Sequence, residues 1–227
     1  MGYVVANQVA LYVVTNLANA GPEGTVATYQ YAFAFFQLPH GLIAVSLMTA
    51  VLPRLATSFV DGDSDGFRDN FREGLNVLFT VVLAASAGYV VVAEPLVQVV
   101  FQRGAFSASG TAETTRTLIA FAVGLPAFST YLYAIRAFHA RQNTRTPFWV
   151  NAAENGLNIM LAMVLTTRTA SGLALAFSGA YVIAAVVGVM VLNYQVRDLV
   201  ERSLFTMMAK AALAAGVTVL GAMIPMA

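Results

Sequence analysis

The chain has 227 residues, of which 59% are hydrophobic and only 10% are charged. Soluble domains carry about 25% charged residues, so this composition excludes an ordinary soluble protein and indicates an integral membrane protein. The formal net charge of +1 gives no basic patch for a nucleic-acid partner, and the lack of cysteine excludes disulfides and thiolate metal sites.

Seven long apolar segments follow one another, each near the roughly 20 residues that cross the hydrocarbon core of a bilayer. They cover residues 2–20, 29–52, 75–93, 117–138, 147–166, 173–196 and 204–227. Strands of a membrane β-barrel are shorter and alternate polar with apolar residues, which these segments do not. The sequence therefore predicts an all-α, polytopic membrane helix bundle over residues 1–227. Because apolar segments reach both termini, we expect a fragment of a longer membrane protein.

The second segment is interrupted near its middle by Pro39, His40 and Gly41. Proline removes a backbone donor and glycine adds flexibility, which predicts a broken helix. The fourth segment repeats this pattern with Gly124 and Pro126. Broken helices line the midplane cavity of many transporters, but prolines also occur in membrane helices for curvature alone. The four proline and glycine positions are candidate hinges, and both interpretations stay open.

The polar loop "DGDSDG" resembles the start of an EF-hand, with Asp61, Asp63 and Asp65 at alternate positions. A calcium loop of this kind needs a glutamate at its twelfth position, where Arg72 stands. We therefore expect a loop that caps the following helix. The two histidines of the chain have no metal-ligand spacing, so the sequence predicts neither a metal nor a cofactor. After the third segment, residues 96–101 are expected to form a short interfacial helix that stops near Gly104.

Arginines are distributed unevenly between the two sides of the expected bundle. Cytoplasmic loops carry the excess of lysine and arginine, so the richer side is predicted to be cytoplasmic. Eight arginines follow the second, fourth and sixth segments (Arg54, Arg68, Arg72, Arg136, Arg141, Arg145, Arg197 and Arg202), and three lie on the other side (Arg103, Arg116 and Arg168).

Glu154 lies inside the fifth apolar segment and shares a helix face with Asn158, four residues later. A carboxylate in hydrocarbon is costly, so it should face a cavity or a partner, or be protonated. It is either part of a polar cavity that binds a cation or a proton, or a structural group that hydrogen-bonds between helices. Asn7, Gln8 and His40 are candidates for the same cavity, and His40 is equally a structural histidine. No Ser–His–acid set or phosphate loop is present, so catalysis has no support.

Three stretches resemble one known family. "QLPHGLIAVSLMTAVLPRLA" is similar to the eighth helix of the MurJ/MviN lipid II flippases, and "AEPLVQVVFQRGAFS" is similar to their EPL-V–FERGAF segment. "GLPAFSTYLYAIRAFHARQNTRTP" resembles the family's GLPAF followed by RAFYA-x-x-DTRTP. The order and spacing of the three also fit, and the chain is identified as a member.

The resemblance implies about fourteen helices in two lobes around a central cavity. This chain would hold helices seven to thirteen, which are the C-terminal lobe and one following helix, and would lack the N-terminal lobe. The implied function is non-enzymatic: alternating-access transport of lipid II, the lipid-linked peptidoglycan precursor, across the bacterial cytoplasmic membrane. The implied partners are this precursor, membrane lipids and the missing lobe. A pyrophosphate headgroup needs donors, for which Asn7, Gln8, His40 and Arg136 are candidates.

The chain departs from the family at one cavity position. Many members have an arginine there, in a YADRL pattern, where this chain has Ala34 preceded by Phe33. This loss favours an alternative, a transport-dead membrane scaffold that recruits cell-wall synthesis partners. A third interpretation is an exporter of drugs or of another lipid-linked polysaccharide, against which the RGAF and RTP stretches argue.

Overall fold

The structure is a computed structural model that describes residues 2–101, 108–164, 169–200 and 206. Within these ranges every regular element is helical, which confirms the predicted class. The elements are α1 (Gly2–Asn19), α2 (Thr25–Pro39), the π-helical turn η1 (His40–Ala44), α3 (Val45–Val60), α4 (Ser64–Phe101), α5 (Ala108–Ala140), α6 (Arg145–Val164) and α7 (Ala170–Gln195). The seventh expected segment, 204–227, lies outside the described residues except for position 206.

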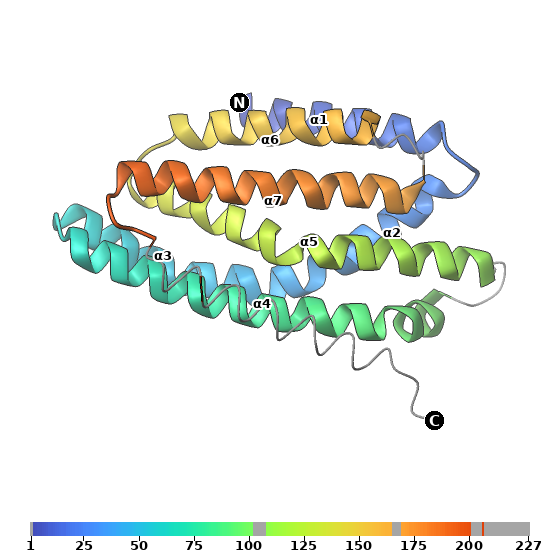
Figure 1. Cartoon of the computed structure of the whole chain (residues 1–227), viewed down its shortest axis with the longest axis horizontal. Helices are drawn as coiled ribbons and strands as arrows, with labels where there is room; N and C mark the ends of the chain where they lie inside the picture. The colour runs from blue at the N-terminus through green and yellow to red at the C-terminus, as the bar shows by residue number, and fades with distance from the viewer. Residues whose placement is uncertain (1, 102–107, 165–168, 201–205, 207–227) are drawn as a thin grey trace.

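The helices run back and forth along one common axis (Figure 1). α5 is the central helix and packs against α4 on one side and α7 on the other, while α6 packs against α7 and α1. The α3–α4 turn, the α5–α6 turn and the end of α7 lie together at one end of the bundle (Figure 1). This arrangement places the loops after the second, fourth and sixth apolar segments on one side, as expected, and their cytoplasmic location stays a prediction.

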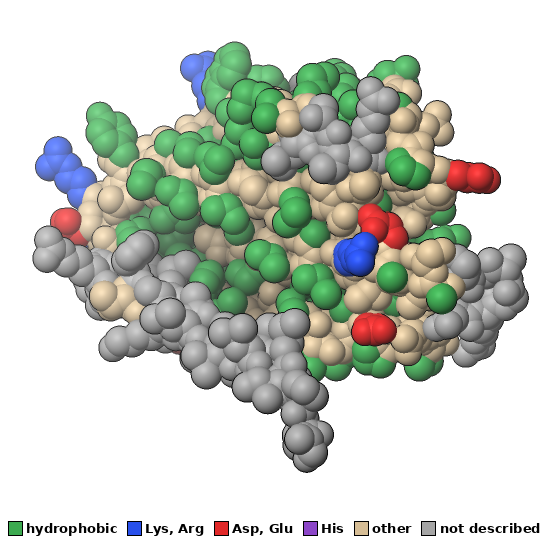
Figure 2. Space-filling model, turned by 45° about the vertical axis from the view of Figure 1, so that its right-hand side comes forward, with side chains coloured by type: hydrophobic (Ala, Val, Ile, Leu, Met, Phe, Trp, Pro, Cys, Tyr) green, Lys and Arg blue, Asp and Glu red, His purple; other side chains and the backbone are tan. Residues whose placement is uncertain are grey.

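Four of the helical stretches in the described part of the chain are long and apolar enough to cross a membrane. They are Thr25–Val60, Ser64–Phe101, Ala108–Ala140 and Ala170–Gln195. α1 and α6 fall below this hydropathy because asparagines interrupt them. Figure 2 shows hydrophobic side chains scattered over the whole visible face, with few charged side chains among them, as a surface in contact with lipid requires.

The break at Pro39 is a change of hydrogen bonding rather than a gap in the helix. η1 follows Pro39 directly, and the Val45 N–H donates to the carbonyl of His40, five residues back. Such π-turns are typical insertions in long helices and are frequent at functional sites. Gly41 lies in η1 with free space around its Cα. In α5, Gly124 and Pro126 lie within one continuous helix.

α4 is longer than the sequence analysis expects. It runs without interruption from Ser64 through Pro95 to Phe101, so the separate interfacial helix predicted at 96–101 is wrong, and Gly104 lies outside the described residues. A proline removes only one backbone hydrogen bond, and here a Gln98 to Glu94 side-chain bond of 3.2 Å spans the position. The capping prediction is confirmed, because Asp63 Oδ1 accepts a bond of 2.9 Å from the Gly66 N–H.

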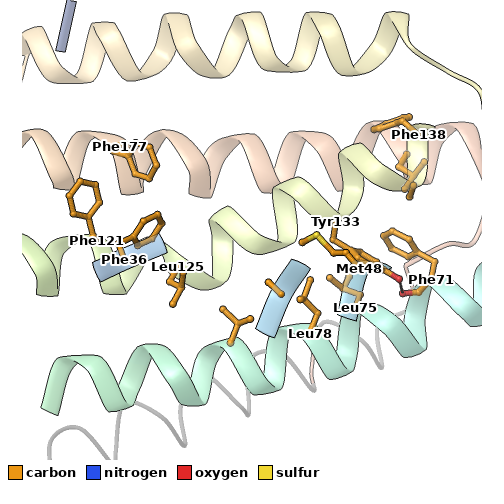
Figure 3. Close-up of a cluster of buried hydrophobic side chains, with 14 of the residues drawn as sticks. Phe36, Met48, Phe71, Leu75, Leu78, Phe121, Leu125, Tyr133, Phe138 and Phe177 are labelled. Carbon is orange, nitrogen blue, oxygen red and sulfur yellow. Dashed lines mark hydrogen bonds between the residues drawn. The ribbon is translucent and has the colours of Figure 1, made fainter. Parts of the chain in front are cut away.

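The core lies where α4, α5 and α7 meet, with α2 and α3 on the same side (Figure 3). One group of aromatic rings gathers around Phe121 of α5, including Phe36 of α2 and Phe177 of α7, with ring centroids 5.2 to 5.6 Å apart. α5 and α7 approach closely at Gly124, where an added Cβ would lie 2.9 Å from the Cα of Ser178. A side chain at this position would push the two helices apart, so the seam requires glycine.

Candidate functional site

A pocket of about 190 Å³ opens between α1, α2, α6 and α7. Its walls combine aromatic rings from α2 and α7 with polar side chains from α1 and α6. The main lining residues are Asn7, Thr15, Tyr29, Phe33, Glu154, Asn155, Asn158, Phe177 and Tyr181. Two of the four helices, α1 and α6, are those whose asparagines lower their hydropathy, so the polar interruptions noted in the sequence gather around one cavity.

The polar wall comes from one face of α6. Asn151, Glu154, Asn155 and Asn158 are spaced by three or four residues and therefore point the same way. All four are buried, and Glu154 is only 2% exposed. Burial of this face against α1 and α7 explains how a helix with these residues can lie within an apolar bundle, because the polar groups meet one another instead of lipid.

Part of this face ties α6 to two other helices, α1 and α5. Asn155 donates to Asn7 Oδ1 of α1 at 2.8 Å and to the carbonyl of Asn151 at 2.9 Å. Asn151 donates in turn to the hydroxyl of Tyr131 on α5, at 3.4 Å. These bonds fit the structural interpretation of the cluster, that of polar side chains joining helices.

The remaining oxygens are not explained by such bonds. Neither carboxylate oxygen of Glu154 makes a hydrogen bond with a described residue, nor do the Oδ1 atoms of Asn151 and Asn158. Tyr181 of α7 lies close enough for its hydroxyl to act on the Glu154 carboxylate. Buried oxygens without donors are costly, so this set is suited to a cation, a proton or water. Among the described residues no three His, Cys, Asp or Glu side chains come together, so it is not an ordinary carboxylate-rich metal centre.

The structure brings Asn7, Glu154 and Asn158 together but leaves the other predicted site residues outside the pocket. Gln8 is exposed on the surface of α1. His40 is buried in η1, with Nδ1 3.0 Å from Ser129 Oγ of α5 and its ring 4.7 Å from that of Phe128. Arg136 is half-buried on α5, near enough for its charge to act on His40.

Tyr181 and Thr15 line the pocket without being identified from the sequence. Tyr181 is one of two tyrosines in α7, and Thr15 follows Asn7 at a spacing of eight, about two helical turns. Both signals are visible in the sequence, but each residue is equally common in the ordinary interior of a membrane bundle, so only the fold distinguishes them.

A family model described as lipid II flippase MurJ matches residues 1–227. A solved structure titled "Lipid II flippase MurJ, inward closed conformation" superposes with a TM-score of 0.80 at 27% sequence identity, covering 96% of this chain and 45% of that chain. A probable lipid II flippase MurJ of Rhizobium meliloti is 34% identical over 74% of this chain, and the lipid II flippase MurJ of Thermosipho africanus is 31% identical over 74%. The chain spans about a third of the length of these two relatives, 32% and 34%.

Proposed function

Because the chain belongs to the lipid II flippase MurJ family, we propose that it forms one lobe of a transporter that moves lipid II across the cytoplasmic membrane. The observation that carries the proposal is the family match over residues 1–227, which the superposition on a solved flippase supports at a TM-score of 0.80. The family is one of multi-pass proteins of the bacterial inner membrane, and the four long apolar helices of this chain fit that location.

The second lobe is part of the proposal. The superposition covers 45% of the solved flippase chain, so a complete transporter would need a further lobe facing this one across the cavity. Transport by rocking of two lobes then requires the substrate headgroup to pass between them while its lipid tail stays in the bilayer. The substrate leaves chemically unchanged, so the role is that of a transporter and not of an enzyme.

Within this lobe we assign the pocket around Glu154 to coupling. Asn7, Glu154 and Asn158 offer oxygens that would bind a cation or a proton in one conformation and release it in another. The clustering of buried oxygens without a donor among the described residues supports this role, because Asn151, Glu154 and Asn158, all on one face of α6, carry four of them. Gln8, His40 and Arg136 stay candidate contacts of the anionic headgroup, since each can donate hydrogen bonds.

The scaffold alternative rests on one position. Ala34, which stands where many family members have a cavity arginine, is exposed on α2 and contributes no charge. A scaffold would keep the fold and lose transport, so the two functions differ in one measurable respect.

Transport by the full-length protein distinguishes them. We expect the full-length gene to restore growth of a strain depleted of its own flippase, and the purified protein to move lipid II between leaflets of proteoliposomes. The 227-residue chain alone, reconstituted in the same vesicles, should not translocate lipid II, because one lobe cannot enclose the cavity. A folded full-length protein that fails both assays would contradict the flippase and favour the scaffold.

A further inference from the structure

Two buried prolines lie inside described helices, beyond the first turn, and each leaves a backbone carbonyl without its helical donor. A third buried proline, Pro147, lies in the first turn of α6, where the missing N–H breaks no helical bond. Pro39 cannot donate to the carbonyl of Phe35, and Pro126 cannot donate to that of Ala122, because proline has no N–H. A carbonyl left unpaired in the interior of a membrane protein costs several kcal/mol, so each must find another donor.

Both donors come from α4. The Tyr89 hydroxyl donates to the Phe35 carbonyl at 3.1 Å, and the Ser86 hydroxyl donates to the Ala122 carbonyl at 2.5 Å. Residues three apart lie on the same face of a helix, so one turn of α4 supplies both bonds. α4 is otherwise apolar at this level, which makes the placement of two hydroxyls there specific to the two breaks.

The exposed prolines provide an internal comparison. Pro53 and Pro95 free the carbonyls of Thr49 and Val91, which face outward and receive no side-chain donor among the described residues. Among the described helices, hydroxyl donors are therefore found at the two buried prolines that interrupt a helix past its first turn. A hydrogen bond also joins the two breaks directly: His40 Nδ1 lies 3.0 Å from Ser129 Oγ. His40 directly follows Pro39, and Ser129 follows Pro126 by three residues.

We propose that Ser86 and Tyr89 are positioning residues that tie the proline breaks of α2–η1–α3 and α5 into one hinge unit. A change in the bend at Pro39 moves the Phe35 carbonyl away from Tyr89 and the His40 ring away from Ser129. The bend of α5 then changes with it, because Ser86 and Tyr89 belong to the same rigid turn of α4. The consequence for transport rests on the proposed function, but the linkage between the helices does not.

A double-mutant cycle tests the assignment in the full-length protein. Ser86→Ala should shift the unfolding equilibrium at least about fivefold toward the unfolded state, as expected for a buried carbonyl that loses its donor. In a Pro126→Ala background the backbone N–H is restored, and the effect of Ser86→Ala should vanish. Tyr89→Phe should behave in the same way with Pro39→Ala and should keep its full effect with Pro126→Ala.

Ser178→Ala is the matched control. Ser178 is a buried serine that donates at 2.7 Å to the Ala120 carbonyl of α5, which already has its helical donor in Gly124. Its effect should be independent of Pro126. If Ser86→Ala has the same effect with and without Pro126, the hydroxyl is ordinary interhelical packing and the assignment is wrong.

Stability measurements do not report how the helices bend, so the hinge is tested by measuring distances between them. Spin labels at Val60 and His139, both exposed at the ends of α3 and α5, report the distance between the two bent helices. The distance distribution should broaden in Ser86→Ala and in Tyr89→Phe and stay unchanged in Ser178→Ala. Unbroadened distributions in both variants would overturn the hinge unit, whatever the result of the transport assays.

Discussion

α7 packs against α5 on one side and against α1 and α6 on the other. The first contact stabilises the lobe, and the second borders the pocket to which we assign its function. Toward α5, α7 forms a close apolar seam, in which Gly124 lets the backbone of Ser178 approach. Toward α1 and α6 it borders a pocket in which the oxygens of Glu154 and Asn158 Oδ1 have no hydrogen-bond donor among the described residues. The seam has the close packing of a protein interior, whereas the pocket keeps costly unpaired groups. Natural proteins keep such costs where function needs them.

Substitution in the seam should have the largest effect on stability. Gly124→Ala places a Cβ against Ser178 and should lower the free energy of unfolding by about 1–3 kcal/mol, the usual cost of overpacking. Thermal unfolding of the full-length protein in detergent measures it.

Gly156→Ala is the control, because nothing lies within 4 Å of an added Cβ there. Alanine is the better helix former, so this variant should be unchanged or slightly more stable. Equal losses at both glycines would mean that the close approach of α5 and α7 does not limit stability.

A hydroxyl of the core should have a smaller effect. Tyr133 of α5 donates to the Phe71 carbonyl of α4 at 3.2 Å, and the two residues lie side by side in the core (Figure 3). Tyr133→Phe should cost about 1 kcal/mol of unfolding free energy, the net value of one hydrogen bond. Chemical denaturation would measure this loss, and a loss above that of Gly124→Ala would reverse the order we assign to packing and polar contacts.

The bridge between α1 and α6 should contribute less still. Asn155→Ala removes the bond to Asn7, and interhelical polar contacts in membranes average about 0.6 kcal/mol. A loss of several kcal/mol in the same denaturation assay would show that the polar cluster holds the bundle together and would favour the structural interpretation of the pocket.

The sequence predicted the class, the first six helical segments and the family, because long apolar runs and Leu-Pro motifs are local signals. Of the six cavity candidates named from the sequence, Asn7, Glu154 and Asn158 line one pocket and Gln8, His40 and Arg136 do not, and a functional role for any of them stays a prediction. The sequence did not predict Tyr181, nor that Ser86 and Tyr89 face Pro126 and Pro39. Those relations depend on how α4, α5 and α7 pack, and a serine or tyrosine in an apolar run gives no indication of its partner.

The smallest effect is expected at a position predicted as a hinge. Gly41→Ala meets no neighbour and needs no unusual backbone, so stability should change by less than about 0.5 kcal/mol, as at most unconstrained surface positions. The variant therefore reduces the backbone flexibility of η1 without disturbing side-chain packing. Reduced lipid II translocation by this stable variant would support a movement of η1 during transport. Normal translocation would show that Gly41 is not needed as a hinge and that Pro39 accounts for the bend.

The central claim, that the pocket exists for transport, depends most on Glu154. Glu154→Gln keeps the size and the hydrogen-bonding capacity of the side chain but removes the charge and the titratable proton. Complementation of a flippase-depleted strain, with full-length variants at matched membrane abundance, is the direct measurement. We predict that Glu154→Gln reduces rescue while the protein stays folded, and that Glu154→Leu abolishes rescue without lowering abundance. Full rescue by Glu154→Gln would contradict a cation- or proton-coupling role and leave the pocket a structural feature.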